Sequence, residues 1–199
     1  MEPADRRVQI LRSARRVFAR RGYHDTAVSD IVADAGIARG TLYLYFDGKR
    51  EVFGVLLEEL LHELDVRIRP VRLGPQEAPP LDQVRENVRR VIELLVGDPD
   101  NVRLLLQQAS GLDRGSQAAL GRFNARVARM IESSLEAGVT LGILRECDTR
   151  VVCACIIGMV KEVVERIALR EGPAGDLDAV AGQIVQFGLN GILGIAKRP

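Results

Sequence analysis

The sequence is poor in aromatic residues and has no tryptophan. It contains three tyrosines and five phenylalanines among 199 residues. The tyrosines are Tyr23, Tyr43 and Tyr45, and no tyrosine follows Phe53. The scarcity of rings disfavours a pocket for flat aromatic cations, which needs stacking partners. The clustering of the tyrosines indicates that residues 20–50 need phenolic hydroxyl groups for a purpose that the rest of the chain does not share.

The sequence also lacks the patterns of a membrane span, an exported chain or a metal site. Its longest apolar run, VVCACIIGMV, has about ten residues, whereas a bilayer span needs roughly 20. The start, MEPADRRVQI, has no apolar signal-peptide core. Cys147, Cys153 and Cys155 are odd in number and show no metal-ligand spacing. We therefore expect a cytoplasmic protein with reduced thiols, no bound metal and no membrane partner.

No catalytic pattern is recognisable. The chain has two histidines, His24 and His62, and no H-E-x-x-H, G-x-S-x-G, phosphate-binding loop or paired-cysteine motif. No set of residues resembles a nucleophile beside its base. We therefore expect no enzymatic activity and no cofactor.

Charge is unevenly distributed, although the net charge is only +1. Residues 1–50 hold ten basic and six acidic residues, a net charge of +4, and residues 51–199 hold 18 basic and 21 acidic residues, a net charge of −3. This asymmetry indicates a polyanion-binding N-terminal part on a slightly acidic body. Arginines that merely solvate helix faces would give the same signal.

Apolar residues recur at helical spacing along nearly the whole chain, which predicts an all-α fold. The first helix should end at Gly22, the second should start at Thr26 as its N-cap and end at Gly36, and a short third helix should cover 38–45. A long fourth helix should stop before Pro70, because the segment PVRLGPQEAPP cannot continue it. Later helices are predicted at about 81–97, 100–110, 115–140, 149–170 and 176–196.

Residues 26–46 predict a helix-turn-helix, in which the second helix enters the DNA major groove. Leu42 and Phe46 lie four residues apart and should face the core. Arg39 on the outer side can bind guanine O6 and N7 together, and the hydroxyl of Tyr43 suits a phosphate. Lys49 can hold a phosphate together with the free N–H groups at the start of the next helix.

The segment DTAVSDIVADAGIARGTLYLYFDGKREVF resembles the N-terminal DNA-binding domain of the TetR family of transcriptional regulators. The resemblance spans roughly residues 6–55 and includes Thr26, the Ala35-Gly36-Ile37 turn and the Gly40-Thr41-Leu42-Tyr43 run. It implies a three-helix DNA-binding domain over residues 1–50. It also implies a helical ligand-sensing and dimerisation domain over residues 51–199.

Three positions depart from the family pattern. Ala38 replaces the usual Ser or Thr cap of the recognition helix, and Ser29 stands where a basic residue is frequent. Leu44 can touch a thymine methyl group but reads no hydrogen-bond pattern. For Tyr45, packing and a phosphate contact stay open. The residues expected to contact DNA are Thr26, Ser29, Arg39, Gly40, Thr41, Tyr43, Leu44, Tyr45 and Lys49.

The last two helices should pair with those of a second subunit, as the family resemblance implies. Residues 151–160 are apolar on every face, so the helix must be covered on more than one side. The final helix carries four glycines, which destabilise it unless something packs closely there. A core within one chain is the alternative. The expected interface residues are Val152, Ile156, Met159, Val163, Val180, Ile184, Phe187 and Gly191.

The effector is expected to be hydrophobic, because a pocket with few rings suits an aliphatic or acyl-chain ligand. Residues that could line or orient it are Gln107, Gln108, Phe123, Asn124 and Asn190, although a satisfied core or surface group is the more common role for each amide. We predict a homodimeric repressor released by such a molecule from a palindromic double-stranded operator. The alternative is a helical partner-binding or ligand-binding protein without operator-specific DNA binding.

Overall fold

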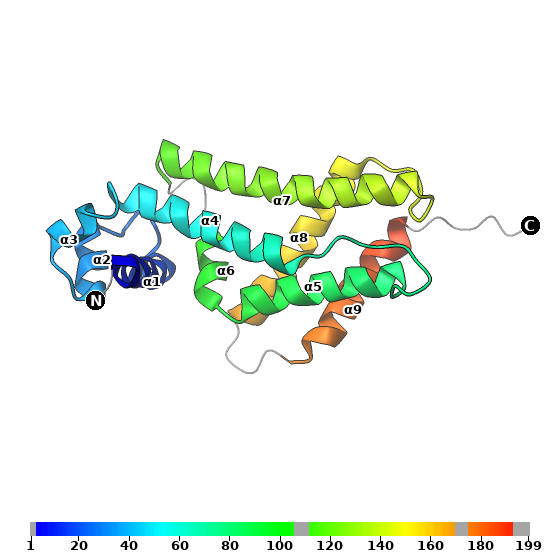
Figure 1. The fold of residues 1–199 in the computed structure, drawn as a ribbon, viewed down its shortest axis with the longest axis horizontal. Helices are drawn as coiled ribbons and strands as arrows, with labels where there is room; N and C mark the ends of the chain where they lie inside the picture. Colours follow the sequence, from blue (N-terminus) through cyan, green and yellow to red (C-terminus); the bar gives the residue numbers. More distant parts are fainter. Residues whose placement is uncertain (1–2, 106–111, 170–174, 193–199) are drawn as a thin grey trace, which may run out of the picture. The chain divides into compact units, whose positions relative to one another are not determined.

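The computed structural model of the chain describes residues 3–105, 112–169 and 175–192, and the described residues form nine helices (Figure 1). The all-α prediction is confirmed, and the predicted helix limits that fall within the described ranges agree with the observed ones to within a few residues. The ends predicted at about 110, 170 and 196 lie outside the described residues. None of the helices in the described ranges is long and apolar enough to cross a membrane. The helices are α1 Pro3–Arg21, α2 Val28–Ala35, α3 Arg39–Tyr43, α4 Lys49–Arg67, α5 Pro80–Val96, α6 Pro99–Leu105, α7 Arg114–Thr140, α8 Thr149–Ala168 and α9 Leu177–Ile192.

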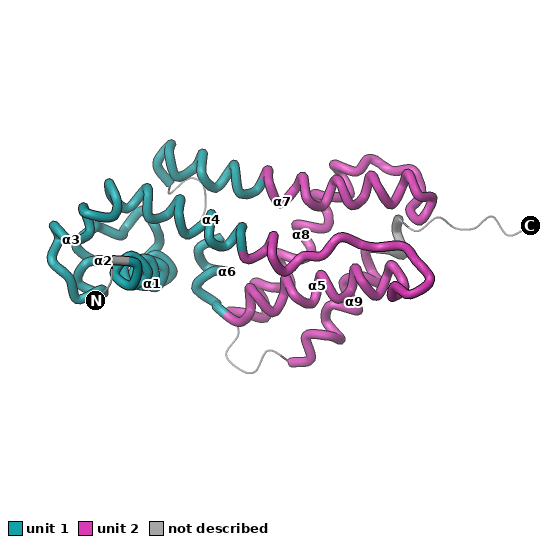
Figure 2. Tube along the Cα trace, in the orientation of Figure 1, with its two compact units in different colours: residues 1–62, 98–124 teal, residues 63–97, 125–199 magenta. Residues whose placement is uncertain are grey.

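The chain divides into two compact units (Figure 2). Unit 1 comprises residues 1–62 and 98–124, and unit 2 comprises residues 63–97 and 125–199. Helices α4 and α7 each contribute residues to both units. The domain boundary expected at residue 50 stays a prediction, because the units group residues by contact and not by role.

The core of unit 1 forms around the apolar stripe of α1. Ile10, Ala14 and Phe18 of this stripe are fully buried. Leu42 and Phe46 are also buried, which confirms the predicted inner side of the third helix. The Phe18 and Phe53 rings meet edge to face, with centroids 6.0 Å apart. Burial of this apolar surface fixes α3 against the other helices of the unit.

Ion pairs join α1 to α2 on the surface of unit 1. Arg16 and Arg20 each lie 2.6 Å from a carboxylate oxygen of Asp34, and Arg21 lies 2.7 Å from one of Asp30. Partial burial raises the pKa of Asp34, but hydrogen bonds from Arg16, Arg20 and Ser13 outweigh it and leave the pKa below its ordinary value. Much of the positive charge of α1 is therefore neutralised within the protein.

The start of α2 differs from the prediction that Thr26 caps it. Ala27 occupies the N-cap, and its backbone N–H donates to the Asp30 carboxylate at 2.8 Å. Thr26 is buried, and its hydroxyl donates instead to the carbonyl oxygen of Gly22 at 2.7 Å. The capping prediction is wrong because the threonine hydroxyl binds the carbonyl group of Gly22, the residue directly after α1, and not the first N–H groups of α2.

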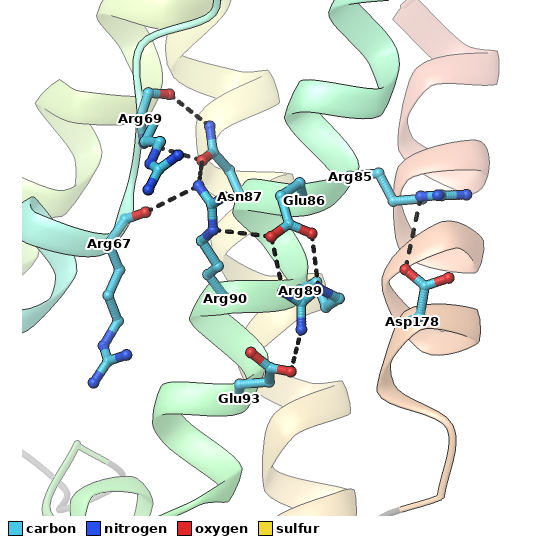
Figure 3. Close-up of polar contacts among 9 residues, drawn as sticks. All are labelled: Arg67, Arg69, Arg85, Glu86, Asn87, Arg89, Arg90, Glu93 and Asp178. Carbon is cyan, nitrogen blue, oxygen red and sulfur yellow. Dashed lines mark hydrogen bonds and ion pairs between the residues drawn. The ribbon is translucent and has the colours of Figure 1, made fainter. Parts of the chain in front are cut away.

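In unit 2, α5 packs against α8 and α9, and α8 contacts α9. The buried residues of these helices include Ile92, Val164 and Ile184. Figure 3 shows a polar network on α5, in which Glu86 binds Arg89 and Arg90 at 2.7 and 3.0 Å. Hydrogen bonding from Arg89 is the largest cause that lowers the pKa of Glu86 to about 2.

The predicted break after α4 is confirmed, since no helix covers residues 68–79. Two amide side chains of α5 bind the backbone of this segment. Asn87 accepts from the N–H of Arg69 at 3.0 Å and donates to the Arg69 carbonyl at 2.7 Å (Figure 3). Gln83 makes the equivalent pair with Arg72 at 2.9 and 2.8 Å. The segment is thereby held along α5 without a helix of its own.

Candidate nucleic-acid interface

The outer surface of α3 carries most of the predicted DNA-contacting residues. Arg39 and Gly40 are exposed, the exposed fractions of Tyr43 and Leu44 are 47% and 81%, and Thr41 is half-buried. The Arg39 guanidinium lies 5.9 Å from the centroid of the Tyr43 ring. A charged donor, a phenol and an apolar side chain thus share one exposed surface, which matches the groups that bind bases and phosphates.

Helix α3 owes its position to the turn before it and to its buried side. Gly36 adopts the left-handed conformation with φ +64°, and the N–H of Ile37 donates to the Val32 carbonyl at 3.0 Å. Ala38 is the N-cap and makes no side-chain capping hydrogen bond, as its sequence predicts. Leu42 is fully buried. The outer residues are therefore presented by packing and turn geometry rather than by a side-chain cap.

Gly40 has no structural need to be glycine. A Cβ atom built on it meets nothing within 4 Å, and its φ angle is not positive. The packing of the chain would therefore accept alanine at this position. The fold therefore offers no other explanation for the glycine that would compete with the prediction that DNA approaches the backbone closely at Gly40.

Two further predicted contacts lie on or near α2. Ser29, in the first turn of this helix, is exposed. Thr26 is 1% exposed, and its hydroxyl already binds Gly22. A third, Tyr45, lies two residues after the end of α3 and is half-buried. The structure thus brings Ser29 to the surface and places Thr26 inside. Contacts of these residues with DNA stay predictions.

Lys49 lies at the start of α4 and binds the turn between α1 and α2. Its Nζ donates to the carbonyl oxygens of Tyr23, His24 and Thr26 at 2.9, 3.2 and 2.8 Å. It also lies 4.5 Å from the centroid of the Tyr23 ring. An ammonium group has three donors, so these carbonyls match its capacity. The predicted phosphate contact stays a prediction. The internal role was not predicted from the sequence, because no local sequence pattern indicates it.

Of the residues predicted to contact the ligand, the structure describes the side chains of Phe123 and Asn124, and their ligand contacts stay predictions. Phe123 is buried and Asn124, which follows it on α7, is exposed. Gln107, Gln108 and the side chain of Asn190 lie outside the described residues. Among the described residues, no group of three or more His, Cys, Asp or Glu side chains is arranged to hold a metal ion.

The predicted dimer face of α8 is partly open. Half-buried residues there are Val152, Ile156, Met159 and Val163. On α9, Phe187 is 77% exposed, Ile184 is buried and Val180 is half-buried. The burial of Gly191 is not among the described features of α9. A Cβ atom on Gly188 would lie 3.4 Å from the Met159 methyl group. This distance is an ordinary van der Waals contact, so the α8–α9 packing within one chain leaves room for a Cβ atom and does not by itself require this glycine.

Comparison with known proteins matches both parts of the chain to one family. The family model described as bacterial regulatory proteins, tetR family, matches residues 10–56. The model described as tetracyclin repressor-like, C-terminal domain, matches residues 77–192. The first match contains the whole of α2 and α3, and with them the exposed α3 surface.

Relatives of similar length are regulators. The uncharacterized HTH-type transcriptional regulator YdgC of Bacillus subtilis is 27% identical over 192 residues, which cover 94% of this chain and 92% of the relative. The fatty acid metabolism regulator protein of the same organism is 25% identical over 189 residues, covering 93% and 94% of the two chains.

Solved structures share the fold. The fatty acid degradation regulator FadR from Bacillus halodurans superposes with a TM-score of 0.77 at 24% identity and covers 100% of this chain and 99% of its own. FadR from Bacillus subtilis in complex with stearoyl-CoA superposes with a TM-score of 0.75 at 24% identity, covering 93% and 98%. With both parts of its sequence matched, the chain belongs to the TetR family of DNA-binding transcriptional regulators.

Proposed function

We propose that the protein is a homodimeric repressor that binds a palindromic operator through α3 and leaves it when a hydrophobic small molecule binds. The exposed group of Arg39, Tyr43 and Leu44 on α3 is the observation that carries this proposal. It offers one side chain for guanine, one for a phosphate and one for a thymine methyl group. The packing of the fold does not by itself explain why an arginine, a tyrosine and a leucine occupy these exposed positions.

The proposed dimer forms through α8 and α9. The exposed Phe187 and the half-buried apolar residues of α8 support it, because large apolar patches on a monomer mark interaction surfaces. A two-fold dimer places two α3 helices on two half-sites, which explains why the operator should be palindromic.

The proposed effector carries an acyl chain, either free or thioesterified to coenzyme A. The low number of rings supports an aliphatic ligand. A relative is named for fatty acid metabolism, and a structure with the same fold contains stearoyl-CoA. The arginines of α5 are engaged with acids of the chain, as Glu86 binds both Arg89 and Arg90, so they do not by themselves favour the coenzyme A form.

DNA binding is tested with duplexes selected from a random-sequence library and with a random duplex, between about 50 and 200 mM salt. We expect a salt-dependent preference for the selected sequences. Arg39→Ala should reduce the preference at one base position by about 10- to 100-fold, because a bidentate arginine–guanine pair supplies that discrimination. The matched control is Arg122→Ala, which removes an exposed arginine of α7. Equal affinity for all sequences would contradict the proposal and favour a helical ligand-binding protein.

The effector is tested by titrating the protein–DNA complex with stearoyl-CoA, stearate and coenzyme A. Release by stearoyl-CoA alone or by both acyl compounds supports an acyl-chain effector and identifies its form. Release by coenzyme A as effectively as by stearoyl-CoA, or by none of the three, would contradict it. Because the complex must form before it can be released, this test is carried out with a duplex that the DNA-binding test has already shown to bind.

A further inference from the structure

Tyr23 occupies the turn between α1 and α2 and is only 2% exposed. Its ring centroid lies 5.4 Å from that of Phe18 and 5.0 Å from that of Phe53. The Lys49 ammonium group that binds three carbonyls of this turn also lies against the ring. Phenylalanine would pack in the same place, so the ring alone does not explain the hydroxyl group.

The Tyr23 hydroxyl donates a hydrogen bond to the carboxylate of Asp113, 90 residues away in the sequence. Asp113 lies directly before α7, and its Oδ1 accepts from the backbone N–H groups of Gly115 and Ser116 at 2.9 and 3.0 Å. Its Oδ2 also accepts from the Ser116 hydroxyl at 3.1 Å. The carboxylate that caps α7 is therefore the acceptor for the phenol.

Burial and the Asp113 carboxylate raise the pKa of Tyr23 to about 12. Partial burial raises the pKa of Asp113, but hydrogen bonds from Tyr23, Ser116 and Gly115 outweigh it and hold the pKa below its usual value. A neutral donor and an ionised acceptor are thus both favoured. Hydrogen bonds of this kind are stronger than those between neutral groups.

A second contact connects the same two regions. A Cβ atom on Gly115 would lie 2.4 Å from Cδ of Arg50, which follows Lys49 on α4. The stem of Arg50 therefore lies directly over the backbone of the first turn of α7. Only glycine leaves room for so close an approach without a shift of the arginine.

We infer that Tyr23 is a positioning residue that couples the helix-turn-helix to the first turn of α7. Its ring and Lys49 hold the α1–α2 turn, and its hydroxyl holds the α7 cap. Helix α7 belongs to unit 1 through Asn124 and to unit 2 from Ala125. A displacement of the start of α7 therefore loosens the turn from which α2 begins. The inference uses the proposed function only in taking DNA as the ligand of the helix-turn-helix.

The test is amide hydrogen exchange in the full-length chain, measured at residues 30–34 of α2 and 117–121 of α7. Tyr23→Phe keeps the ring and removes the hydroxyl group. Asp113→Ser keeps an oxygen that can cap α7, but the serine side chain is too short to reach the phenol. We expect each variant to speed exchange about tenfold in both helices, since hydrogen bonds to charged groups have about this effect. The double variant should exchange no faster than the single variants. The matched control is Asp148→Ser, which makes the same change at the cap of α8.

A residue that only stabilises its own surroundings would give a different result. If Tyr23→Phe leaves exchange in α7 unchanged, or if Asp113→Ser leaves α2 unchanged, the coupling does not exist. If Asp148→Ser speeds exchange in α2 as much as Asp113→Ser does, the effect is global destabilisation and the inference is overturned.

A second arm adds a duplex selected from a random-sequence library. Binding should slow exchange at 117–121 of α7 in the wild-type protein and in Asp148→Ser, and should not do so in Tyr23→Phe, which still binds. Equal slowing in wild type and Tyr23→Phe would overturn the inference. If no duplex is selected by the wild-type protein, the proposed function fails, and the DNA-free comparison still decides whether the two regions are coupled.

Discussion

Replacement of Lys49 by methionine separates its two possible roles, the internal one seen in the structure and the phosphate contact expected from the sequence. Methionine is of similar length and apolar, so it keeps the stem and removes the charge and all three donors. The carbonyls of Tyr23, His24 and Thr26 then lose partners at 2.9, 3.2 and 2.8 Å.

The cost follows from these contacts. A hydrogen bond to a charged group contributes about 1.5–3 kcal/mol, and a cation over an aromatic face about 0.5–1 kcal/mol at an exposed site. Lys49 is half-buried, so water can reach part of the freed carbonyl groups, and the three bonds share one ammonium group. We therefore expect a total loss of about 2 kcal/mol, well below the sum of the bonds. For a chain of this size, such a loss lowers the melting temperature by about 4–8 °C.

The assay combines thermal unfolding with DNA binding at several salt concentrations. A positioning role predicts the stability loss and a weaker affinity, with the slope of log K against log salt unchanged. A phosphate contact predicts a slope smaller by about 1 and little change in stability. Lys161→Met, at an exposed lysine of α8, is the control for loss of one positive charge. Unchanged melting together with a reduced slope would refute the reasoning.

Three further predictions follow from single residues. Gly40→Ala should raise the free energy of unfolding by up to about 1 kcal/mol and weaken DNA binding. The control Gly121→Ala, also at an open helical position, should only raise stability. Equal DNA affinity of the two variants would contradict a close approach of DNA at Gly40. Subtraction of the Tyr23→Phe absorbance titration from that of the wild type should show one phenol ionising near pH 12. Since the folded pKa is raised, the stabilisation is complete below about pH 10, where an unfolded tyrosine ionises, and is lost as the pH rises through about 12; a phenol ionising near pH 10 would refute it. The exposed Cys155 should react with a thiol reagent more slowly as the protein concentration rises and the proposed dimer covers α8, whereas the buried Cys153 should react slowly at all concentrations; a concentration-independent rate at Cys155 would contradict an α8 interface.

The fold could be predicted from the sequence because its signals are local. Gly22 and Gly36 adopt positive φ angles and end α1 and α2, and the proline-rich segment separates α4 from α5. The inner side of α3 followed from the spacing of Leu42 and Phe46. Each of these features depends on residues within one or two helical turns, where periodicity and backbone preference are sufficient.

The roles of polar side chains in the site could not be predicted with the same success. The capping rule was applied to Thr26, but burial brought its hydroxyl to the end of α1. The three acceptors of Lys49 lie 23 to 26 residues before it, and the acceptor of Tyr23 lies 90 residues after it. Such partners depend on how the helices pack, and a single sequence does not specify that.

The composition of the α3 surface also bears on the number of subunits that must act together. One arginine that binds guanine bidentately provides about 1–3 kcal/mol of discrimination, and a contact of Leu44 with a thymine methyl group provides less. A regulator binds its specific site tighter than random DNA by typically about 4–10 kcal/mol. One α3 helix with Arg39, Thr41 and Tyr43 as its polar groups falls below this range, and two copies reach its lower part. The small readout surface is thus a physical argument for two half-sites, independent of any contact on α8 or α9. A monomeric variant should accordingly keep salt-dependent binding and lose most of its preference for the selected duplex.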